Sequence, residues 1–422
     1  MAYPGTIGGA AAAFLPEDPG CLQRNGPFEY GSNLYVCLAD KTTSTMNNLN
    51  MHKSTDGGNT WSVVDSSGGP LIRGVSDPGD PNIFIGAIVD VLQVGAILYV
   101  AYLPRTQPAS IVLNRQAGIT SFDCSTDTWQ GALTTTGPDL ESGTVASASQ
   151  QLISLQLRSN GDFVLVFQGG SGMGSCSYAI FSGGTWGAEV VVAAVGGSVR
   201  SPCGACIDST DRIYFFYPDT PGGLFQLQAK VLQRSLSSAN VLADESVALD
   251  DVQGSQTLPG LPLVWNDGGN EKVGMMYSRG IFYPVPYFHV TKTITGQTYF
   301  ATALAGAMPS FSSVQVNFQN PSKSSGGTEG SDLVFALDGS GNPAALWISG
   351  FRPYSIECNR RSGGNWQTVN TVGWDSLWAD NTLYGQVTNL QGRYLSSRSK
   401  FGFIYQLAMQ SGTSPLIVYN EV

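Results

Sequence analysis

Three arginines and two carboxylates stand out in this sequence because side chains of these types could bind and cleave an acidic sugar. They lie in segments that read as loops, and they are Arg73, Asp77, Glu141, Arg279 and Arg352. A guanidinium presents a fixed fork of donors to a carboxylate, so converging arginines would hold an anionic ligand. Paired carboxyl groups could then act as acid and base on a glycosidic bond. The alternative is that all five are solvated loop charges, as most loop charges are.

Aromatic side chains gather in two further segments, "SRGIFYPVPYFHV" (278–290) and "VGWDSLWADNTLYG" (372–385). Aromatic faces flanked by Asp, Asn and Arg can stack on sugars or grip a protein partner. The candidate ligand-binding residues are Phe282, Tyr283, Tyr287, Tyr354, Trp374 and Trp378. The alternative for each is a place in the hydrophobic core.

Other chemistries find little support in the sequence. Asp77 and Asp80 in "SDPGDPN" could supply oxygen ligands to Ca²⁺, but a third acidic side chain is missing and a proline-stiffened turn is favoured. With 2 histidines and a lone CxxC at Cys203 and Cys206, neither a zinc site nor a histidine-activated nucleophile is expected. The sequence therefore predicts no cofactor.

The composition favours a turn-rich all-β protein. Of the 422 residues, 52 are Gly and 22 Pro, 42% are hydrophobic and only 12% charged, against about 25% charged in typical domains. A net charge of −10 argues against nucleic acid as a partner. The N-terminal apolar run is too short and too broken for a signal peptide or a membrane span. We expect an extracellular or virion-surface protein whose signal was trimmed, or that leaves its producer by another route or by lysis.

A repeat organises the chain. Seven short apolar, aromatic-rich runs recur roughly every 60 residues, a spacing typical of repeat folds, and they begin near 34, 98, 163, 213, 273, 344 and 401. Hairpin turns such as "SNGD" and "DGSGN" precede several of them, and a second turn followed by Trp comes after four of them. Four antiparallel strands per unit predict a seven-bladed β-propeller that occupies 1–422 as one domain. Six blades would result if the long fifth unit is misread.

The last unit lacks one outer strand, because only "SPLIVYNEV" follows its second run. The N-terminal "TIGGAAAAF" is the expected donor of that strand. Closing the ring in this way would also cover a sheet edge that could otherwise pair with other chains.

One hairpin, "KSTDGGNTWSVVD" (53–65), has a distinctive pattern, Ser54-x-Asp56-x-Gly58-x-Thr60-Trp61. This pattern is similar to the Asp box, or bacterial neuraminidase repeat, and the chain resembles the sialidase-like superfamily of β-propellers. In that family the box joins the third and fourth strands of a blade, away from the ligand. Its Trp packs between strands while its Asp and Ser/Thr bond the turn. The resemblance therefore implies a structural role for these five residues.

The resemblance does not supply a catalytic set. Sialidases bind the substrate carboxylate with three arginines, and the first normally lies in an Arg-Ile-Pro motif that is absent here. We therefore expect a non-enzymatic recognition or structural propeller that binds a carbohydrate or protein receptor. Its setting would be a phage tail or head fibre, together with other virion subunits, or else a cellular lectin. The alternative is a sialidase-like glycoside hydrolase with a diverged active site.

Overall fold

The computed structural model describes residues 5–7, 13–14, 24–43, 46–66, 68–73, 89–102, 117–134, 137, 153–169, 175–194, 204–219, 226–232, 241–247, 255–259, 262–282, 292–304, 312–316, 333–349, 355–363, 365–367, 370–372, 384–409 and 416–422. Within these ranges the chain forms strands and turns and no helix. Accordingly, the described part of the chain holds no helix with the length and hydrophobicity to cross a membrane.

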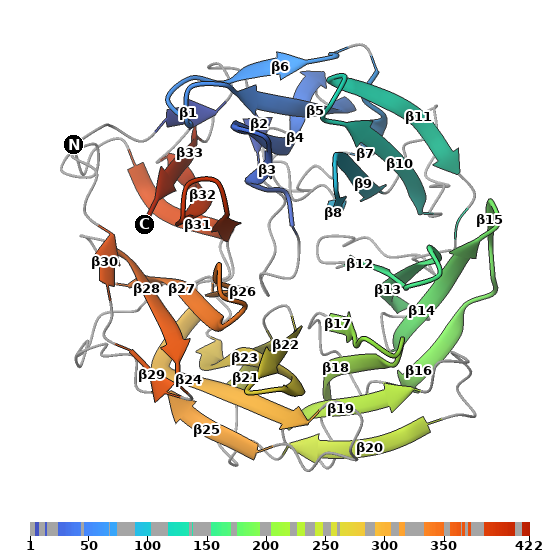
Figure 1. Cartoon of the computed structure of the whole chain (residues 1–422), viewed down its shortest axis with the longest axis vertical. Helices are drawn as coiled ribbons and strands as arrows, with labels where there is room; N and C mark the ends of the chain where they lie inside the picture. The colour runs from blue at the N-terminus through green and yellow to red at the C-terminus, as the bar shows by residue number, and fades with distance from the viewer. Residues whose placement is uncertain are drawn as a thin grey trace.

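The strands pair into seven antiparallel sheets that stand around a ring (Figure 1). In each sheet the strands follow one another from the centre of the ring outwards, which is the architecture of a β-propeller. The all-β propeller predicted from the sequence is thereby confirmed.

The first four sheets, I to IV, follow the chain order. Sheet I contains β2 (Ala13–Phe14), β3 (Phe28–Tyr30), β4 (Asn33–Thr43), β5 (Met46–Ser54), β6 (Ser62–Val64) and β7 (Leu71–Arg73). Sheet II contains β8 (Val89–Val94), β9 (Ile97–Tyr102), β10 (Gly118–Asp123) and β11 (Thr128–Thr134). Sheet III contains β12 (Ile153–Leu157), β13 (Phe163–Gly169), β14 (Ser175–Ser182), β15 (Thr185–Trp186) and β16 (Val190–Ala194). Sheet IV contains β17 (Gly204–Ile207), β18 (Ile213–Asp219), β19 (Gln226–Leu232) and β20 (Val241–Val247).

The remaining three sheets complete the ring. Sheet V contains β21 (Ser255–Pro259), β22 (Leu263–Asp267), β23 (Asn270–Phe282), β24 (Lys292–Leu304) and β25 (Ser312–Val316). Sheet VI contains β26 (Leu333–Leu337), β27 (Pro343–Ser349), β28 (Ser355–Ser362), β29 (Asn365–Trp366) and β30 (Asn370–Val372). Sheet VII contains β31 (Tyr384–Leu395), β32 (Lys400–Met409), β33 (Leu416–Glu421) and the N-terminal β1 (Gly5–Ile7). Each of the seven apolar runs of the sequence forms a strand: β4, β9, β13, β18, β23, β27 or β32.

The N-terminal segment joins the last sheet to the first. β1 pairs antiparallel with β33, with Ile7 opposite Ile417, and β2 pairs with β4 of sheet I. The strand that the sequence expects from the N-terminus therefore lies on β33 and covers its edge.

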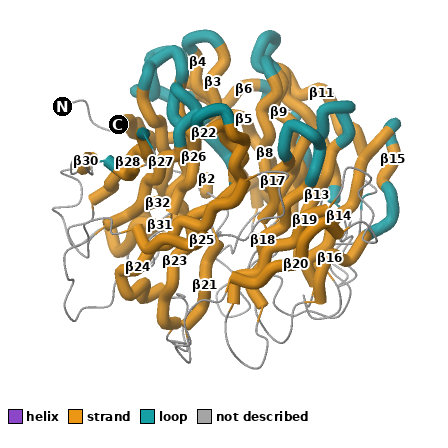
Figure 2. The backbone as a smooth tube through the Cα atoms, turned by 60° about the horizontal axis from the view of Figure 1, so that its bottom comes forward, coloured by secondary structure: helices purple, strands orange, loops and turns teal. Residues whose placement is uncertain are grey.

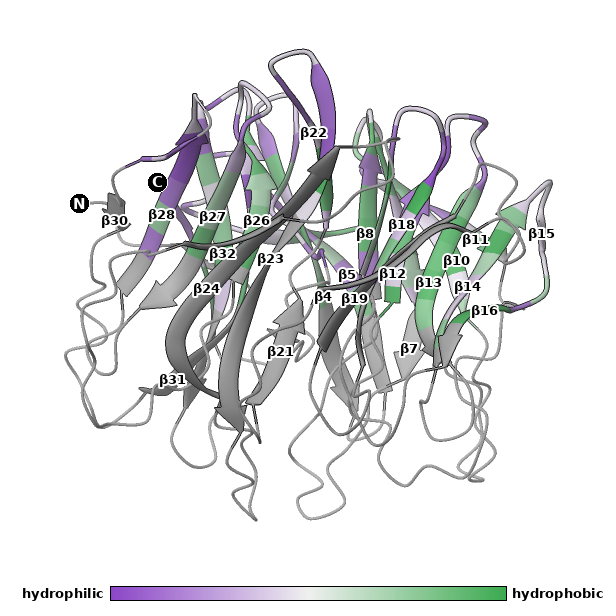
Figure 3. Cartoon of the chain, turned by 90° about the horizontal axis from the view of Figure 1, so that it is seen from below, coloured by the Kyte–Doolittle hydropathy of each residue, from purple (hydrophilic) through white to green (hydrophobic). Residues whose placement is uncertain are grey.

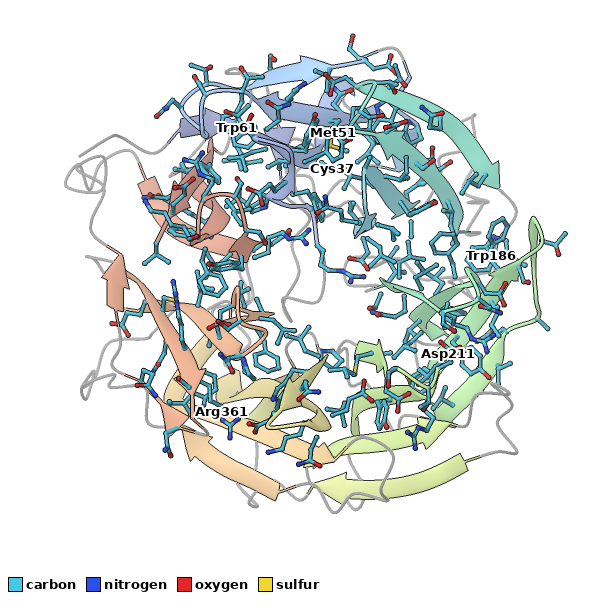
Figure 4. The ribbon with its side chains drawn as sticks, in the orientation of Figure 1. Cys37, Met51, Trp61, Trp186, Asp211 and Arg361 are labelled. Atoms are coloured by element: carbon cyan, nitrogen blue, oxygen red, sulfur yellow. The ribbon has the colours of Figure 1, made fainter. Side chains whose placement is uncertain are left out.

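Apolar side chains fill the spaces between neighbouring sheets. Five hydrophobic clusters are described, and each combines residues of two adjacent sheets: I–II, II–III, III–IV, VI–VII and VII–I. In the first of them, Cys37 and Met51 of sheet I pack with Val100 and Phe122 of sheet II, and Figure 4 labels the first two between the strands. Alternate side chains of each strand thus enter a core shared with the next sheet.

The turns that link the first and second strands of the sheets lie along one edge of the ring, which we call the turn face (Figure 2). It includes 31–32, 95–96, 158–162, 208–212, 268–269, 338–342 and 396–399. Figure 3 shows that this edge is hydrophilic, whereas the strands beneath it are largely hydrophobic.

Candidate functional site

Most candidate residues from the sequence lie outside the described residues: Asp77, Asp80, Glu141, Tyr283, Tyr287, Arg352, Tyr354, Trp374 and Trp378. For Arg73, Arg279 and Phe282 the structure describes the backbone. Arg73 of β7 pairs with Met46, and Arg279 of β23 lies far along its strand from the turn at 268–269. Both arginines therefore lie towards the edge opposite the turn face, and their convergence on one ligand stays a prediction.

The hairpin at 53–65, in which the sequence predicts an Asp box, connects β5 to β6, the third and fourth strands in the order of sheet I. Ser54 Oγ donates to Asp56 Oδ1 (2.8 Å) and accepts from Gly58 N (2.8 Å). Thr60 donates to the Asp56 carboxylate from its hydroxyl (2.6 Å) and its backbone N (2.9 Å). These bonds, that of the Thr60 hydroxyl first, lower the pKa of Asp56 to about 2. The carboxylate is thus engaged in holding its own turn.

The tryptophan of this hairpin joins two sheets. Trp61 Nε1 donates to Gly58 O (3.0 Å), and its ring meets Tyr419 of sheet VII edge-on at 5.4 Å between centroids. Gly58 has φ +91°, and a Cβ there would come within 2.0 Å of the Tyr419 ring. Trp61 lies near the outside of the ring (Figure 4). These contacts give the hairpin a packing role between sheets VII and I.

A cavity of about 280 Å³ lies among the inner strands β3, β8, β22, β26 and β31, close to their turn-face ends. Its apolar lining includes Phe28, Leu92, Leu263, Phe335, Leu337 and Leu390. Its polar side chains are Arg24, Gln93, Gln391, Arg393 and Tyr394. Apolar walls with a few converging polar groups are the usual make-up of a small-ligand pocket.

Arg24 is fixed by a carboxylate beneath the cavity. The side chain of Asp90 in β8 is fully buried, and it accepts from Arg24 Nε (3.0 Å) and Nη2 (2.6 Å). It also accepts from the backbone N of Arg24 (3.0 Å) and of Leu155 (2.6 Å). Arg24 Nη2 donates in addition to Leu155 O. The Asp90 carboxylate therefore accepts from four donors and anchors Arg24 at the cavity.

The chain around Arg24 is positioned by the segment 24–27, which reaches towards the centre of the ring before β3 (Figure 1). Asn25 N donates to Gln391 Oε1 (2.6 Å), and Gln391 Nε2 returns a bond to Asn25 Oδ1 (3.1 Å). Gly26 has φ +137°, and a Cβ there would lie 2.9 Å from Tyr35 O. A glycine is therefore required where the segment passes so close to β4.

Arg393 of β31 is the second guanidinium of the cavity. Its Nη1 donates to Gln93 Oε1 (2.8 Å), and Gln93 Nε2 in turn donates to Glu29 O (2.6 Å). Its guanidinium carbon lies 5.2 Å from the centroid of the Phe28 ring, a cation–π arrangement. Burial and the nearby charge of Arg24 lower the pKa of Arg393 to about 10, and Glu29 opposes them. Among the described residues no carboxylate forms an ion pair with Arg393, and Glu29 acts on it only from a distance.

The sequence analysis did not identify Arg24, Gln93 or Arg393. One signal was present: charged or amide residues interrupt otherwise apolar strands, as in "VDVLQV" (89–94) and "NLQGRYL" (389–395). Such interruptions near the centre of a propeller indicate a polar lining. Among the residues that the structure describes, no group of three or more His, Cys, Asp or Glu side chains could hold a metal ion.

The fold is similar to solved structures of other β-propellers. A structure described as an ulvan lyase of a new polysaccharide lyase family has a TM-score of 0.55 at 11% identity, over 100% of this chain and 95% of the other. The same lyase bound to a GlcA(1-4)Rha3S saccharide has a TM-score of 0.56 at 11% identity and the same coverage. A mutant Aleuria aurantia lectin in complex with Fucalpha1-6GlcNAc has a TM-score of 0.45 at 13% identity, over 80% of this chain and 91% of the lectin.

At these identities the likeness to the lyase shows the fold alone, and the likeness to the lectin is too weak to argue from. No protein-family model matches the chain, and no curated protein is similar to it in sequence.

Proposed function

We propose that this β-propeller is a recognition protein that binds a saccharide in its central cavity. The observation that carries the proposal is the lining of that cavity, in which guanidinium and amide groups face apolar and aromatic walls. Its volume of about 280 Å³ is close to the lower limit of roughly 300 Å³ for small-ligand pockets. The cavity therefore suits one sugar unit, with the rest of a chain outside it. The saccharide-bound lyase of similar fold adds support of an indirect kind.

Binding without cleavage is the favoured form of the proposal. Hydrolysis of a glycosidic bond needs two carboxyl groups roughly 5–10 Å apart on either side of that bond. The described lining of the cavity contains no carboxylate, and Asp90 beneath it is held by Arg24. The alternative remains a sialidase-like glycoside hydrolase that uses Arg73, Asp77, Glu141, Arg279 and Arg352, of which Arg73 and Arg279 lie towards the edge opposite the turn face.

The proposal includes the setting expected from the sequence. We take each of the seven sheets as one blade, so that 1–422 forms a single seven-bladed domain closed by β1 and supported by the Asp box. The low share of charged residues, 12%, favours a protein exposed outside cells, on a virion or as a lectin. A protein receptor, bound through the aromatic segments 278–290 and 372–385, is the second candidate partner.

A glycan array on the purified protein tests this function, with turnover of the same glycans measured on the same sample. We expect binding of a restricted set of glycans and no release of products. Turnover of a bound glycan would show that the protein is an enzyme and would contradict a role in recognition alone. Failure to bind any glycan would favour the protein-receptor alternative.

A further inference from the structure

We propose that the central cavity selects an oxyanion, a carboxylate or a sulfate, on its saccharide ligand, and that Arg393 is the residue that binds it. This inference rests on the proposed saccharide-binding function and specifies its chemistry. It concerns the turn-face end of the ring, whereas Arg73 and Arg279, two arginines of the acidic-sugar site predicted from the sequence, lie towards the opposite edge.

Of the two arginines that line the cavity, Arg393 is the one whose positive charge is not paired with a carboxylate among the described residues. The charge of Arg24 is neutralised by Asp90, with two guanidinium nitrogens on the carboxylate at 3.0 and 2.6 Å. Glu29 attracts Arg393 from a distance without pairing with it. The Glu29 carboxylate instead accepts hydrogen bonds from Ser397, one from the backbone N (3.1 Å) and one from the hydroxyl. A partly buried cation without an ion-pair partner among the described residues is stabilised when an anion joins it.

The guanidinium of Arg393 is also held in one orientation. Its Nη1 is occupied by Gln93, whose own amide is fixed by Glu29 O, and its plane lies near the Phe28 ring. Nε and Nη2 have no acceptor among the described residues. These two nitrogens form the edge that grips a carboxylate in a bidentate way. Arg24 uses the same edge on Asp90, so this molecule already contains the arrangement that we infer for the ligand.

The cavity walls favour an anion that is part of a sugar over a free inorganic ion. Leu92, Leu263 and Leu337 are partly exposed and present apolar surface to the cavity. The carbon face of a pyranose can cover such surface while its acidic group reaches Arg393. Free phosphate or sulfate would leave the same walls exposed to water and should bind more weakly.

Calorimetric titration tests the inference with three oligosaccharides of equal length: one containing uronic acid, one sulfated and one neutral. The proteins are the wild type, Arg393→Gln, Arg393→Lys and the control Arg361→Gln. Arg361 donates to Asp267 (3.1 Å) at the boundary of sheets V and VI, and it does not line the cavity. Circular dichroism and the thermal midpoint of each variant show whether it is folded.

We expect the wild type and Arg361→Gln to prefer an acidic saccharide by about 10–100-fold, the effect of a charge-assisted hydrogen-bonded pair. Arg393→Gln should lose this preference while retaining any weak affinity for the neutral sugar, and Arg393→Lys should keep part of it. In the wild type, affinity for the acidic ligand should fall as salt rises. The uronic and sulfated ligands distinguish a carboxylate from a sulfate as the preferred group.

Equal affinity of the wild type for acidic and neutral saccharides would overturn the inference and leave saccharide binding in place. Retention of the acidic preference by a folded Arg393→Gln variant would also overturn it. If Arg393→Gln is unfolded, the inference is tested instead by the preference of the wild type for acidic over neutral saccharides and by the salt dependence of its affinity for the acidic ligand. Absence of binding by all three ligands, after a negative glycan array, would reject the proposed function itself.

Discussion

Two arginines of the central cavity show how partners decide what a side chain can do. Arg24 has a buried carboxylate against its Nε–Nη2 edge and serves to tie the segment before β3 to sheets II and III. Arg393 has an amide on one nitrogen and an aromatic ring against its plane, and no described residue accepts from the same edge. Two identical residue types therefore differ in their partners within the described part of the chain, and this difference is the basis of the role proposed for Arg393.

The glycine of the β5–β6 hairpin, Gly58, gives a first test at the scale of single residues. Gly58→Ala adds a Cβ that overlaps Tyr419, whereas Gly161, at φ +88° close to the +91° of Gly58, has open space around it. Both substitutions share the cost of a left-handed backbone. We expect Gly58→Ala to lower the free energy of unfolding by about 1–3 kcal/mol more than Gly161→Ala, the usual cost of overpacking. Denaturant unfolding measures the difference, and equal losses would show that Tyr419 moves aside freely.

The carboxylate of the same hairpin gives a test by pH. The pKa of Asp56 is about 2 in the folded chain against an ordinary 3.8, so the ionised form is the one that the fold stabilises. Its contribution is therefore fully present above pH 3.8 and is lost as the pH falls towards 2. Asp56→Asn should have a lower thermal midpoint than the wild type at pH 6, and this gap should close as the pH approaches 2. A gap that stays constant across this range would contradict the assignment.

Neighbouring sheets are joined at the turn face by a recurring contact between a carboxylate and a serine. Asp211 of sheet IV accepts from the backbone N (2.9 Å) and hydroxyl (2.6 Å) of Ser159 in sheet III. Glu271 of sheet V accepts likewise from Ser209 of sheet IV, at 3.0 and 2.9 Å. Glu29 of sheet I makes the same pair of bonds to Ser397 of sheet VII. The carboxylate comes each time from the following sheet, and Figure 4 shows Asp211 at the boundary of sheets III and IV.

A double-mutant cycle tests whether this contact couples the sheets. Asp211→Asn keeps a residue type that tolerates the φ of +63° at this position, and Ser159→Ala removes the hydroxyl donor. We expect a coupling free energy of about 1 kcal/mol in denaturant unfolding, the size of a typical hydrogen bond. Asp211→Asn combined with Ser340→Ala, which lies in the turn of sheet VI, should show no coupling. Additive effects in the first pair would mean that the bonds do not transmit stability between sheets.

The sequence predicts the elements well because strands and turns depend on local patterns. Apolar runs with the period of a strand identify β4, β9 and β13, and turn residues such as those of "SNGD" give the observed hairpin, in which Arg158 N donates to Asp162 O (2.9 Å). The cavity could not be predicted in the same way. Arg24 and Arg393 come from opposite ends of the chain, and only closure of the ring brings them together. No local pattern records that proximity.

Ring closure is the feature that governs the whole molecule. β1 supplies the outer strand of sheet VII, and Ile7, only 2% exposed, packs in the cluster of sheets VII and I with Leu34 and Ile417. The same closure sets the spacing of β3, β8 and β31 around the cavity. We therefore expect stability to depend on this short N-terminal strand.

Truncation of the Ile7 side chain tests this dependence. Ile7→Ala removes buried methyl groups and should lower the free energy of unfolding by about 2–5 kcal/mol. The control Val63→Ala is at a 37% exposed position of β6 and should change it by about 0.5 kcal/mol or less. Thermal unfolding of the two variants gives the comparison. A neutral Ile7→Ala would show that β1 contributes little to closing the ring.

The most direct test of saccharide recognition by the cavity is a crystal structure of the protein with the best ligand from the glycan array. We expect one sugar unit between β8, β26 and β31, with an acidic group on Nε and Nη2 of Arg393 and the rest of the ligand leaving at the turn face. A ligand bound instead against the segments 278–290 and 372–385 would contradict this expectation and would return the site to the loops that the sequence first indicated.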